Sequence, residues 1–260
     1  MISRDTDDNN VYRCLGQFSE IKPSVPFETN QYHTLLANVN LEQVSNSRQI
    51  ANLVEPNEHG AFPIVRTTTK YNQPSQLFTE AHKDLIRKIY EASQRDMKLN
   101  NAMLEVYTSE YSKMKFHTDQ ALDLADNSHI CLFSCYENEQ EPNPRILRVK
   151  EKATGAVYEI ILDHHSIIVF STQTNASHLH KIVADPGPGK ECRSNWLGIT
   201  FRQSKTYVER NDHNTSFVAT GKPVRLATDE ERKQFFMYKK LENEQSGYVY
   251  PDIDYTLSIH

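Results

Sequence analysis

The 260-residue chain lacks any long apolar run, and its four cysteines form no C-x-x-C pair. A membrane-spanning helix needs about 20 consecutive, mostly apolar residues. The N-terminal Met-Ile-Ser-Arg-Asp also lacks the apolar core of a secretory signal. We therefore expect a soluble, intracellular and cytoplasmic protein with no membrane partner. Cys131 and Cys135 share a face of one predicted strand and are expected to be reduced core thiols.

The chain also lacks an excess of basic residues, because its net charge is −5 and its pI is about 6.1. This composition argues against tight, sequence-independent binding of nucleic acid, but it allows brief handling of a nucleotide substrate. An apolar content of 38% over 260 residues is ordinary for one globular domain with additions. We expect a single domain.

Strand-like segments dominate the middle of the chain. Short apolar runs separated by turn residues are typical of a β-sandwich or barrel, and not of alternating β and α units. The strands are expected at residues 102–107, 113–117, 129–136, 145–149, 157–162, 166–171, 178–183 and 196–202.

The flanking regions divide the chain further. Residues 1–12 are polar and acidic, and we expect a flexible lead-in there. Residues 13–100 are expected to support or cover the core, with one helix near 41–54 and a long amphipathic helix over 76–95 laid on a sheet. Residues 101–205 form the expected core. Residues 206–260 are expected to form an extension packed on the core. Within this extension, the capping-box spacing of Thr228 and Glu231 predicts the start of a helix.

The candidate metal site begins with the H-x-D of His117 and Asp119. On a strand, residues two apart project from the same face, so these side chains can offer a nitrogen and a carboxylate oxygen to one ion. His180 would complete a 2-His-1-carboxylate set, which leaves an octahedral iron open for a co-substrate and dioxygen. A second H-x-D, His82 and Asp84, falls in the 76–95 helix, where positions two apart diverge and cannot chelate one ion.

This order of residues resembles the Fe(II)/2-oxoglutarate-dependent dioxygenases, and the finer pattern resembles their AlkB-like branch. That branch carries R-x-N-x-T-x-R after its last metal ligand. Here Arg193, Asn195, Thr200 and Arg202 follow in the same order, with three extra residues between the asparagine and the threonine. The resemblance, which spans about residues 100–205, implies that Arg193 holds the distal carboxylate of 2-oxoglutarate through two charge-assisted hydrogen bonds, with Arg202 as the second candidate and Asn195 beside them.

The three extra residues change which side chains share a face. An odd insertion means that Arg193 and Arg202 cannot both point inward from one regular strand, unless a bulge near Gly198 restores the second arginine. Upstream, Tyr107 matches the tyrosine of the family's N-x-Y, whose hydroxyl also binds the co-substrate. Glu105 stands in the place of the asparagine. Because neighbouring carboxylates repel each other, Glu105 is expected to point away or to be protonated.

The remaining histidines compete with His180 for the metal. His178 lies two residues earlier on the same strand and shares its face, but His180 is followed by Lys-Ile-Val, as the family's ligand is, and is preferred. His164 and His165 lie in a turn between apolar strands and are expected to be solvated. Trp196 is expected in the core.

The resemblance implies a mainly β (α+β) fold, a double-stranded β-helix or jelly roll with supporting N-terminal helices. It also implies an enzyme that uses Fe(II), 2-oxoglutarate and dioxygen to hydroxylate or oxidatively demethylate its substrate. The AlkB-like motif favours an alkylated nucleobase or nucleoside, free or in nucleic acid. The acidic composition and the missing asparagine favour a small molecule, amino acid or peptide instead. A cupin-like metal site and a non-catalytic jelly-roll module are further alternatives. Loops 67–74 and 120–128 are expected to shape the substrate pocket.

Overall fold

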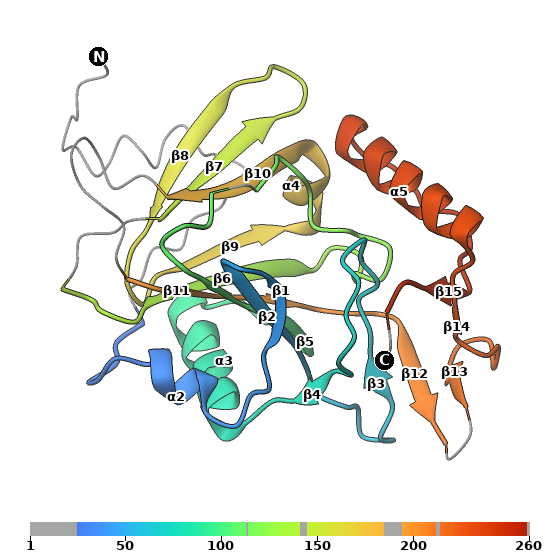
Figure 1. Cartoon of the computed structure of the whole chain (residues 1–260), viewed down its shortest axis with the longest axis horizontal. Helices are drawn as coiled ribbons and strands as arrows, with labels where there is room; N and C mark the ends of the chain where they lie inside the picture. The colour runs from blue at the N-terminus through green and yellow to red at the C-terminus, as the bar shows by residue number, and fades with distance from the viewer. Residues whose placement is uncertain (1–24, 113, 141–144, 185–193, 212–213, 259–260) are drawn as a thin grey trace.

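The computed structural model describes residues 25–112, 114–140, 145–184, 194–211 and 214–258. A large, mostly antiparallel sheet forms its centre (Figure 1). In spatial order its strands are β1 (Glu42–Ser45), β2 (Arg48–Val54), β5 (Asn101–Tyr107), β11 (Trp196–Arg202), β6 (His129–Tyr136) and β9 (Ile167–Ser171), and β4 (Gln76–Leu77) pairs with β2. A smaller sheet consists of β10 (His178–Ala184), β7 (Arg145–Glu151) and β8 (Val157–Leu162).

The order of the strands is that of a jelly roll. The eight successive extended segments of the core are β5, the segment at His117, β6, β7, β8, β9, β10 and β11. The first, eighth, third and sixth are neighbours in the large sheet. The seventh, fourth and fifth form the small sheet, and the second joins it through a bridge between His117 and His180. Two interleaved antiparallel sheets of this order confirm the predicted fold class.

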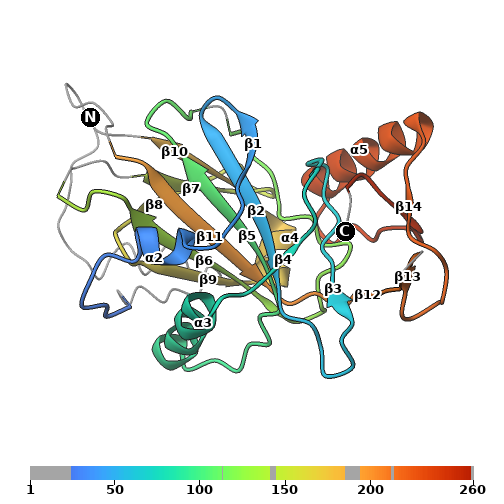
Figure 2. The ribbon, with the colours of Figure 1, turned by 60° about the horizontal axis from the view of Figure 1, so that its bottom comes forward.

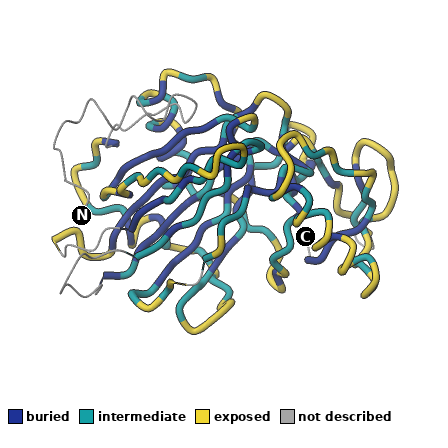
Figure 3. The backbone as a smooth tube through the Cα atoms, turned by 90° about the horizontal axis from the view of Figure 1, so that it is seen from above, coloured by how far each residue is buried: buried dark blue, intermediate teal, exposed yellow. Residues whose placement is uncertain are grey.

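The central strands β5, β11 and β6 of the large sheet are buried on both faces, because apolar side chains project from both faces. On β6, Cys131, Phe133 and Cys135 enter the core cluster that contains α3 (Glu80–Ser93), whereas Ile130 and Leu132 enter the cluster shared with the small sheet. Figures 1 and 2 show α3 on one face of the large sheet and the small sheet on the other. Figure 3 shows buried residues along the strands and exposed residues gathered in the loops. Cys131 and Cys135 are buried free thiols, as predicted.

Two expected elements are wrong. Residues 41–54 form the antiparallel strands β1 and β2, not a helix, because Asn46 and Ser47 make a turn and β2 pairs along its whole length with β5. The expected strand 113–117 is reduced to the single bridge at His117, and residue 113 lies outside the described residues. The other strands of the core, and the helix within 76–95, form where predicted.

The C-terminal extension covers one end of the sandwich (Figure 2). It contains α5 (Asp229–Glu244), whose capping box forms as predicted: Glu231 N–H donates to Thr228 Oγ1, and Thr228 N–H donates to Glu231 Oε2. The minor elements are α2 (Tyr32–Leu36), β3 (Phe62–Pro63), α4 (Thr172–Ser177), β12 (Tyr207–Arg210), β13 (Thr215–Phe217), β14 (Arg225–Leu226) and β15 (Tyr255–Thr256). The predicted lead-in, residues 1–12, lies outside the described residues. Within the described part of the chain, no helix has the length and apolarity needed to cross a membrane.

Candidate metal centre

His117 and His180 face each other across the antiparallel bridge. The N–H of His117 donates to the carbonyl oxygen of His180 at 3.0 Å, and the reverse bond measures 2.7 Å. Directly opposed residues in such a pair project to the same face, and the two ring centroids lie 4.7 Å apart. Asp119 brings Oδ1 to 3.6 Å from His180 Nε2. One ligand atom of each residue lies within 4.8 Å of the other two, so the structure brings the three predicted ligands together.

Hydrogen bonding selects the nitrogen that His117 can offer to a metal. His117 Nδ1 lies 2.9 Å from the carbonyl oxygen of Lys115. A carbonyl can only accept, so Nδ1 carries the proton and the free lone pair is on Nε2. Metal-ligating histidines commonly donate their second N–H in this way. Burial, together with His180 and Lys239, lowers the pKa of His117 to about 3, so the ring is neutral and able to ligate at neutral pH.

Asp119 is buried and held as a carboxylate. Burial alone would raise its pKa, but the Arg202 guanidinium and His180 outweigh this effect and keep the pKa of Asp119 well below its usual range. Arg202 Nε donates to Asp119 Oδ2 at 2.9 Å. Asn175 of α4 fixes the backbone on both sides, because its amide accepts from Asp119 N–H and donates to Asp119 O, each at 2.8 Å. Asp119 is therefore both ionised and fixed in place.

A cavity of about 300 Å³ opens beside these residues. His117 and Asp119 lie in its wall with four cationic side chains, Arg48, Lys115, Arg202 and Lys239. The loops expected to shape the pocket contribute Thr67, Thr68, Thr69, Tyr71 and Gln120. These four cations outnumber the two carboxylates of the wall, Asp119 and Glu105, so the cavity is suited to an anionic or strongly hydrogen-bonding ligand.

A second, narrower cavity of about 30 Å³ reaches His180. Its wall shares His117 and Asp119 with the larger cavity and is otherwise mainly apolar, with Leu132, Leu147, Phe170 and Ile182. Apolar side chains on this side exclude water from the three ligands and so strengthen the electrostatic interactions among them.

Glu105 points into the larger cavity, so the first of the two outcomes expected for it, that it points away, is wrong. Arg48 of β2 balances its charge: Nη2 lies 2.5 Å and Nε 2.8 Å from Glu105 Oε1. The pair forms because β2 places Arg48 directly opposite Tyr107, on the same face as Glu105. Arg48 lies upstream of the region that resembles the dioxygenases, and no motif marks it.

The strand β11 runs without a bulge at Gly198. Its pairing with β5 and with β6 keeps one register through this residue, so the bulge considered from the sequence does not form. A Cβ at Gly198 would overlap the indole of Trp196, so the glycine instead makes room for a large core side chain. Trp196 is fully buried, as predicted, and its Nε1 donates to Ser134 Oγ at 2.8 Å. Because the strand is regular, Arg202 projects from the same face of β11 as Thr200, and from there it donates to Asp119.

The other predicted co-substrate residues are not brought to the described cavities. Tyr107 is fully buried against Tyr111 and Trp196, with ring centroids 4.0 and 5.0 Å away, and its hydroxyl has no hydrogen-bond partner among the described residues. Asn195 Nδ2 donates to Glu137 Oε2 at 2.8 Å. Arg193 lies outside the described residues.

His178 and His82 have structural partners of their own. His178 is buried, and its Nδ1 lies 3.2 Å from Thr174 O, so it contacts the end of α4. His82 is buried in α3, where Nδ1 accepts from the Thr79 N–H at 3.1 Å and completes a capping box. As expected, His82 does not chelate with Asp84, which pairs with Arg87 on the surface.

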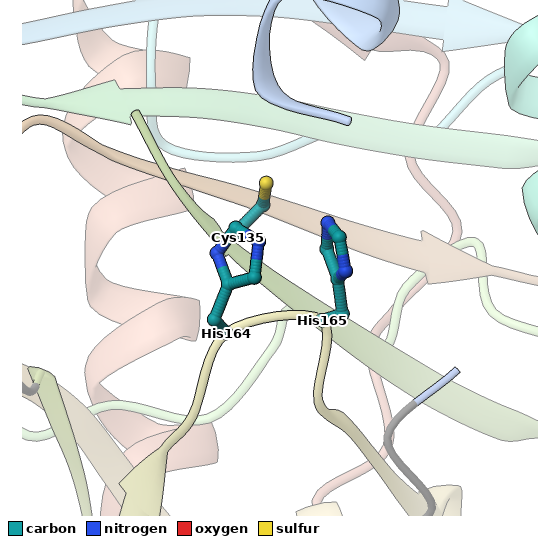
Figure 4. Close-up of side chains that lie close together, drawn as sticks. All are labelled: Cys135, His164 and His165. Atoms are coloured by element: carbon teal, nitrogen blue, oxygen red, sulfur yellow. The ribbon is translucent and has the colours of Figure 1, made fainter. Parts of the chain in front are cut away.

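A second group of potential metal ligands is Cys135, His164 and His165, shown in Figure 4. His164 Nδ1 accepts from the Tyr136 N–H at 3.1 Å, and His165 Nε2 accepts from the Gln31 N–H at 3.2 Å. A neutral imidazole has one lone pair in its plane, so both rings have already used theirs. This group is a hydrogen-bonded corner of the core and not a metal centre. The expectation that both histidines are solvated is wrong, because His165 is buried and His164 is half-buried.

Four residues around the ligands carry no sequence motif: Arg48, Asn175, Lys239 and Glu242. Each comes from an element distant in sequence from His117. Lys239 and Glu242 have helical i, i+3 spacing, but surface ion pairs commonly share that spacing. The sequence therefore offered no signal that would have distinguished them.

The strand order and the ligand set define a jelly-roll protein with a 2-His-1-carboxylate group. No protein-family model and no curated protein matches the chain. Among solved structures, it is similar to OsALKBH1 at 14% identity and a TM-score of 0.41, over 75% of this chain and 90% of that one. It is also similar to a Pseudomonas putida prolyl-4-hydroxylase, at 13% identity and a TM-score of 0.37, over 66% and 81% of the two chains.

A third similar structure is an oxidoreductase of the 2OG-Fe(II) oxygenase family from Burkholderia pseudomallei. The identity is 10% and the TM-score 0.39, over 66% of this chain and 76% of that one. Likeness at this level assigns no activity to the chain, so the function proposed below rests on the side chains of the site.

Proposed function

We propose that the chain is an Fe(II)- and 2-oxoglutarate-dependent dioxygenase. The observation that carries this proposal is the cluster of His117, Asp119 and His180, whose ligand atoms lie within 4.8 Å of one another beside a cavity lined by four cationic side chains. Two imidazoles and one carboxylate suit non-haem iron and leave positions open on it. Bound iron with 2-oxoglutarate and dioxygen supplies the oxidation of a substrate C–H bond, coupled to conversion of 2-oxoglutarate to succinate and carbon dioxide.

The residues of this chain bind and orient the reactants. Arg202 keeps Asp119 ionised, and the guanidinium groups of Arg202 and Arg48, which line the cavity, would bind the carboxylates of 2-oxoglutarate. Arg193 stays the candidate that the motif offers for the distal carboxylate, with Tyr107 and Asn195 as its companions in the resemblance. The apolar wall at Leu132, Leu147, Phe170 and Ile182 keeps water from the reacting centre.

For the substrate, we propose an alkylated nucleobase or nucleoside, whose ring polar groups would be met by Thr67, Thr68 and Thr69. Hydroxylation of an N-methyl group would release formaldehyde and complete a demethylation. The second candidate is hydroxylation of an amino acid or peptide side chain. It is favoured by the Arg48–Glu105 pair, which presents both charges to the same cavity and so suits a zwitterion.

Turnover of 2-oxoglutarate tests the proposed class. The purified protein is incubated in air with Fe(II), ascorbate and 2-oxoglutarate, and succinate is measured without substrate and with each candidate substrate. We expect slow uncoupled succinate release from the wild type and a decrease of at least 100-fold in His117→Ala. His59→Ala is the matched control, because the His59 side chain is exposed and forms an ion pair with the equally exposed Glu58.

Two results would contradict the proposal. One is equal succinate release by wild type and a folded His117→Ala variant. The other is absence of 2-oxoglutarate consumption with every substrate, which would favour the cupin-like or non-catalytic alternatives. Formaldehyde release with a methylated nucleobase would separate demethylation from simple hydroxylation.

A further inference from the structure

The backbone between and just after the ligands His117 and Asp119 hydrogen-bonds to a helix instead of to a strand. The N–H of Thr118 donates to Asn243 Oδ1 at 3.0 Å, and the N–H of Ala121 donates to Glu242 Oε1 at 2.8 Å. Both acceptors belong to α5, which lies next to α4 in Figure 1. Buried N–H groups need partners, and here side chains of α5 replace the ladder that a regular strand would make.

Lys239 makes the shortest contacts with this segment. Its Nζ donates to Thr118 O at 2.6 Å, to Thr118 Oγ1 at 2.7 Å and to Glu242 Oε2 at 2.7 Å. An ammonium group has three N–H donors, so all three are in use. Lys239 therefore fixes the peptide between His117 and Asp119, although its side chain also lines the cavity.

Glu242 also joins α5 to the segment that contains Thr118 and Ala121. It is 4% exposed, and its Oε2 accepts from Thr118 Oγ1 at 3.1 Å and from the Tyr250 hydroxyl at 2.9 Å. With Lys239 and the Ala121 N–H, both carboxylate oxygens are satisfied. A buried ion pair with this number of partners has one preferred geometry.

The helix itself is anchored at its C-terminal end. Lys152 Nζ, just after β7, donates to the carbonyl oxygens of Glu242 at 2.6 Å, Gln245 at 2.9 Å and Ala176 at 2.7 Å. A cation at the last carbonyl groups of a helix also interacts favourably with the helix dipole. Earlier in the helix, Phe235 is fully buried against the C-terminal tail. The helix is therefore a fixed support.

We propose that Lys239 and Glu242 are positioning residues of the metal centre, so that α5 completes a site whose ligands all lie in the jelly roll. Thr118 lies between His117 and Asp119, so a rotation of its peptide would turn both ligands away from a common ion. This inference rests on the proposed metal site. It assigns a role to the C-terminal extension, which lies outside the region that resembles the dioxygenases.

The test removes the buried pair as a unit, because removing one charge alone would leave the other unpaired. The double variant Lys239→Met/Glu242→Leu is compared with Lys240→Met/Glu244→Leu, since Lys240 and Glu244 form an exposed ion pair on the same helix. Thr118→Val is a second variant, which removes the hydroxyl with little change in shape. Folding is checked by circular dichroism, Co(II) binding by titration of its visible spectrum, and the amides of Thr118 and Ala121 by hydrogen exchange.

For Lys239→Met/Glu242→Leu we expect Co(II) affinity to fall at least tenfold, within the range of about 10- to 100-fold that is typical when residues that orient metal ligands are changed. We also expect an altered Co(II) spectrum, and faster amide exchange at Ala121 in the metal-free protein. The Lys240/Glu244 control should stay within twofold of the wild type. If the wild type binds Co(II) and the folded double variant and Thr118→Val bind it with unchanged affinity and spectrum, the positioning role is refuted while the metal centre stands. If the wild type binds no Co(II), the metal centre itself fails.

Discussion

The pairing of Arg202 with Asp119 predicts a large, pH-dependent loss of stability when the arginine is removed. Both side chains are at least 93% buried, and Arg202 Nε donates to Asp119 Oδ2 at 2.9 Å. Arg202→Met removes the charge but keeps much of the apolar stem. It leaves Asp119 with the metal-free histidines as its neighbours. The stability of the metal-free protein is measured, because a bound metal ion would replace the positive charge that is removed with Arg202.

The magnitude follows from burial. Breaking a buried ion pair by removing one partner costs about 3–5 kcal/mol, whereas removing both charges together is often close to neutral. We expect Arg202→Met to lower the free energy of unfolding by about 3–5 kcal/mol at pH 7. The double variant Arg202→Met/Asp119→Asn should recover most of that loss.

The dependence on pH has a definite sign. In the wild type the pKa of Asp119 is depressed, so the carboxylate stabilises the fold at neutral pH, and this stabilisation is lost only as the pH falls below the unfolded pKa of about 3.9. In Arg202→Met, burial raises the pKa of Asp119, so the penalty is greatest at neutral pH and fades as the carboxylate is protonated. The difference between wild type and variant should therefore shrink between pH 7 and pH 4.

Urea unfolding followed by circular dichroism at pH 7, 5 and 4 measures these differences. An Arg202→Met variant within 1 kcal/mol of the wild type at pH 7 would refute the reasoning. A difference that stays constant down to pH 4 would also refute it. Added metal at 100 times its dissociation constant should return about 2.7 kcal/mol to any variant that still binds it.

Three further predictions concern single residues. His180→Ala should weaken Co(II) binding at least 100-fold in equilibrium dialysis while His59→Ala leaves it unchanged; retained binding in His180→Ala would remove that residue from the metal site. Gly198→Ala should lower the free energy of unfolding by about 2–4 kcal/mol, because the new methyl group must displace the Trp196 indole from its bond to Ser134; a loss below 0.5 kcal/mol in urea unfolding would be inconsistent with this packing. Burial lowers the pKa of His82 to about 4 in the folded protein, so protonation of its ring favours the unfolded state. The free energy of unfolding should therefore fall by about 1.4 kcal/mol for each pH unit as the pH drops from 6.5 to 4. His82→Gln keeps the capping-box acceptor and should remove that part of the slope; identical slopes in the two proteins would contradict the assignment.

Local patterns were sufficient for most of the fold. The strands of the core alternate or repeat apolar residues over their own length, and helix α5 begins at a capping box whose residues are three apart. The helix expected at 41–54 was wrong because β2 is stabilised by pairing with β5, a partner about 50 residues away that no local pattern reveals. Among the described residues of the strand expected at 113–117, only His117 pairs with another strand, through its bridge to His180, and the next N–H, that of Thr118, donates to the Asn243 side chain of α5.

Some residues of the candidate site could be predicted from local patterns, and others could not. His117 and Asp119 could be predicted from a two-residue spacing on extended backbone, and His180 and Arg202 from their order in a motif. Arg48, Asn175, Lys239 and Glu242 act through contacts made at long sequence separation, so no spacing could identify them. The same limit explains Glu105, whose inward orientation depends on Arg48.

An anaerobic titration tests whether His117, Asp119 and His180 hold iron with 2-oxoglutarate bound to it. Fe(II) and then 2-oxoglutarate are added to the purified protein, and the visible metal-to-ligand charge-transfer band is recorded for wild type, His117→Ala and His59→Ala. We expect a band in the wild type and in His59→Ala, and none in His117→Ala, which would show iron held by this site with 2-oxoglutarate chelated to it. Absence of the band from the folded wild type, or its persistence in His117→Ala, would contradict the account.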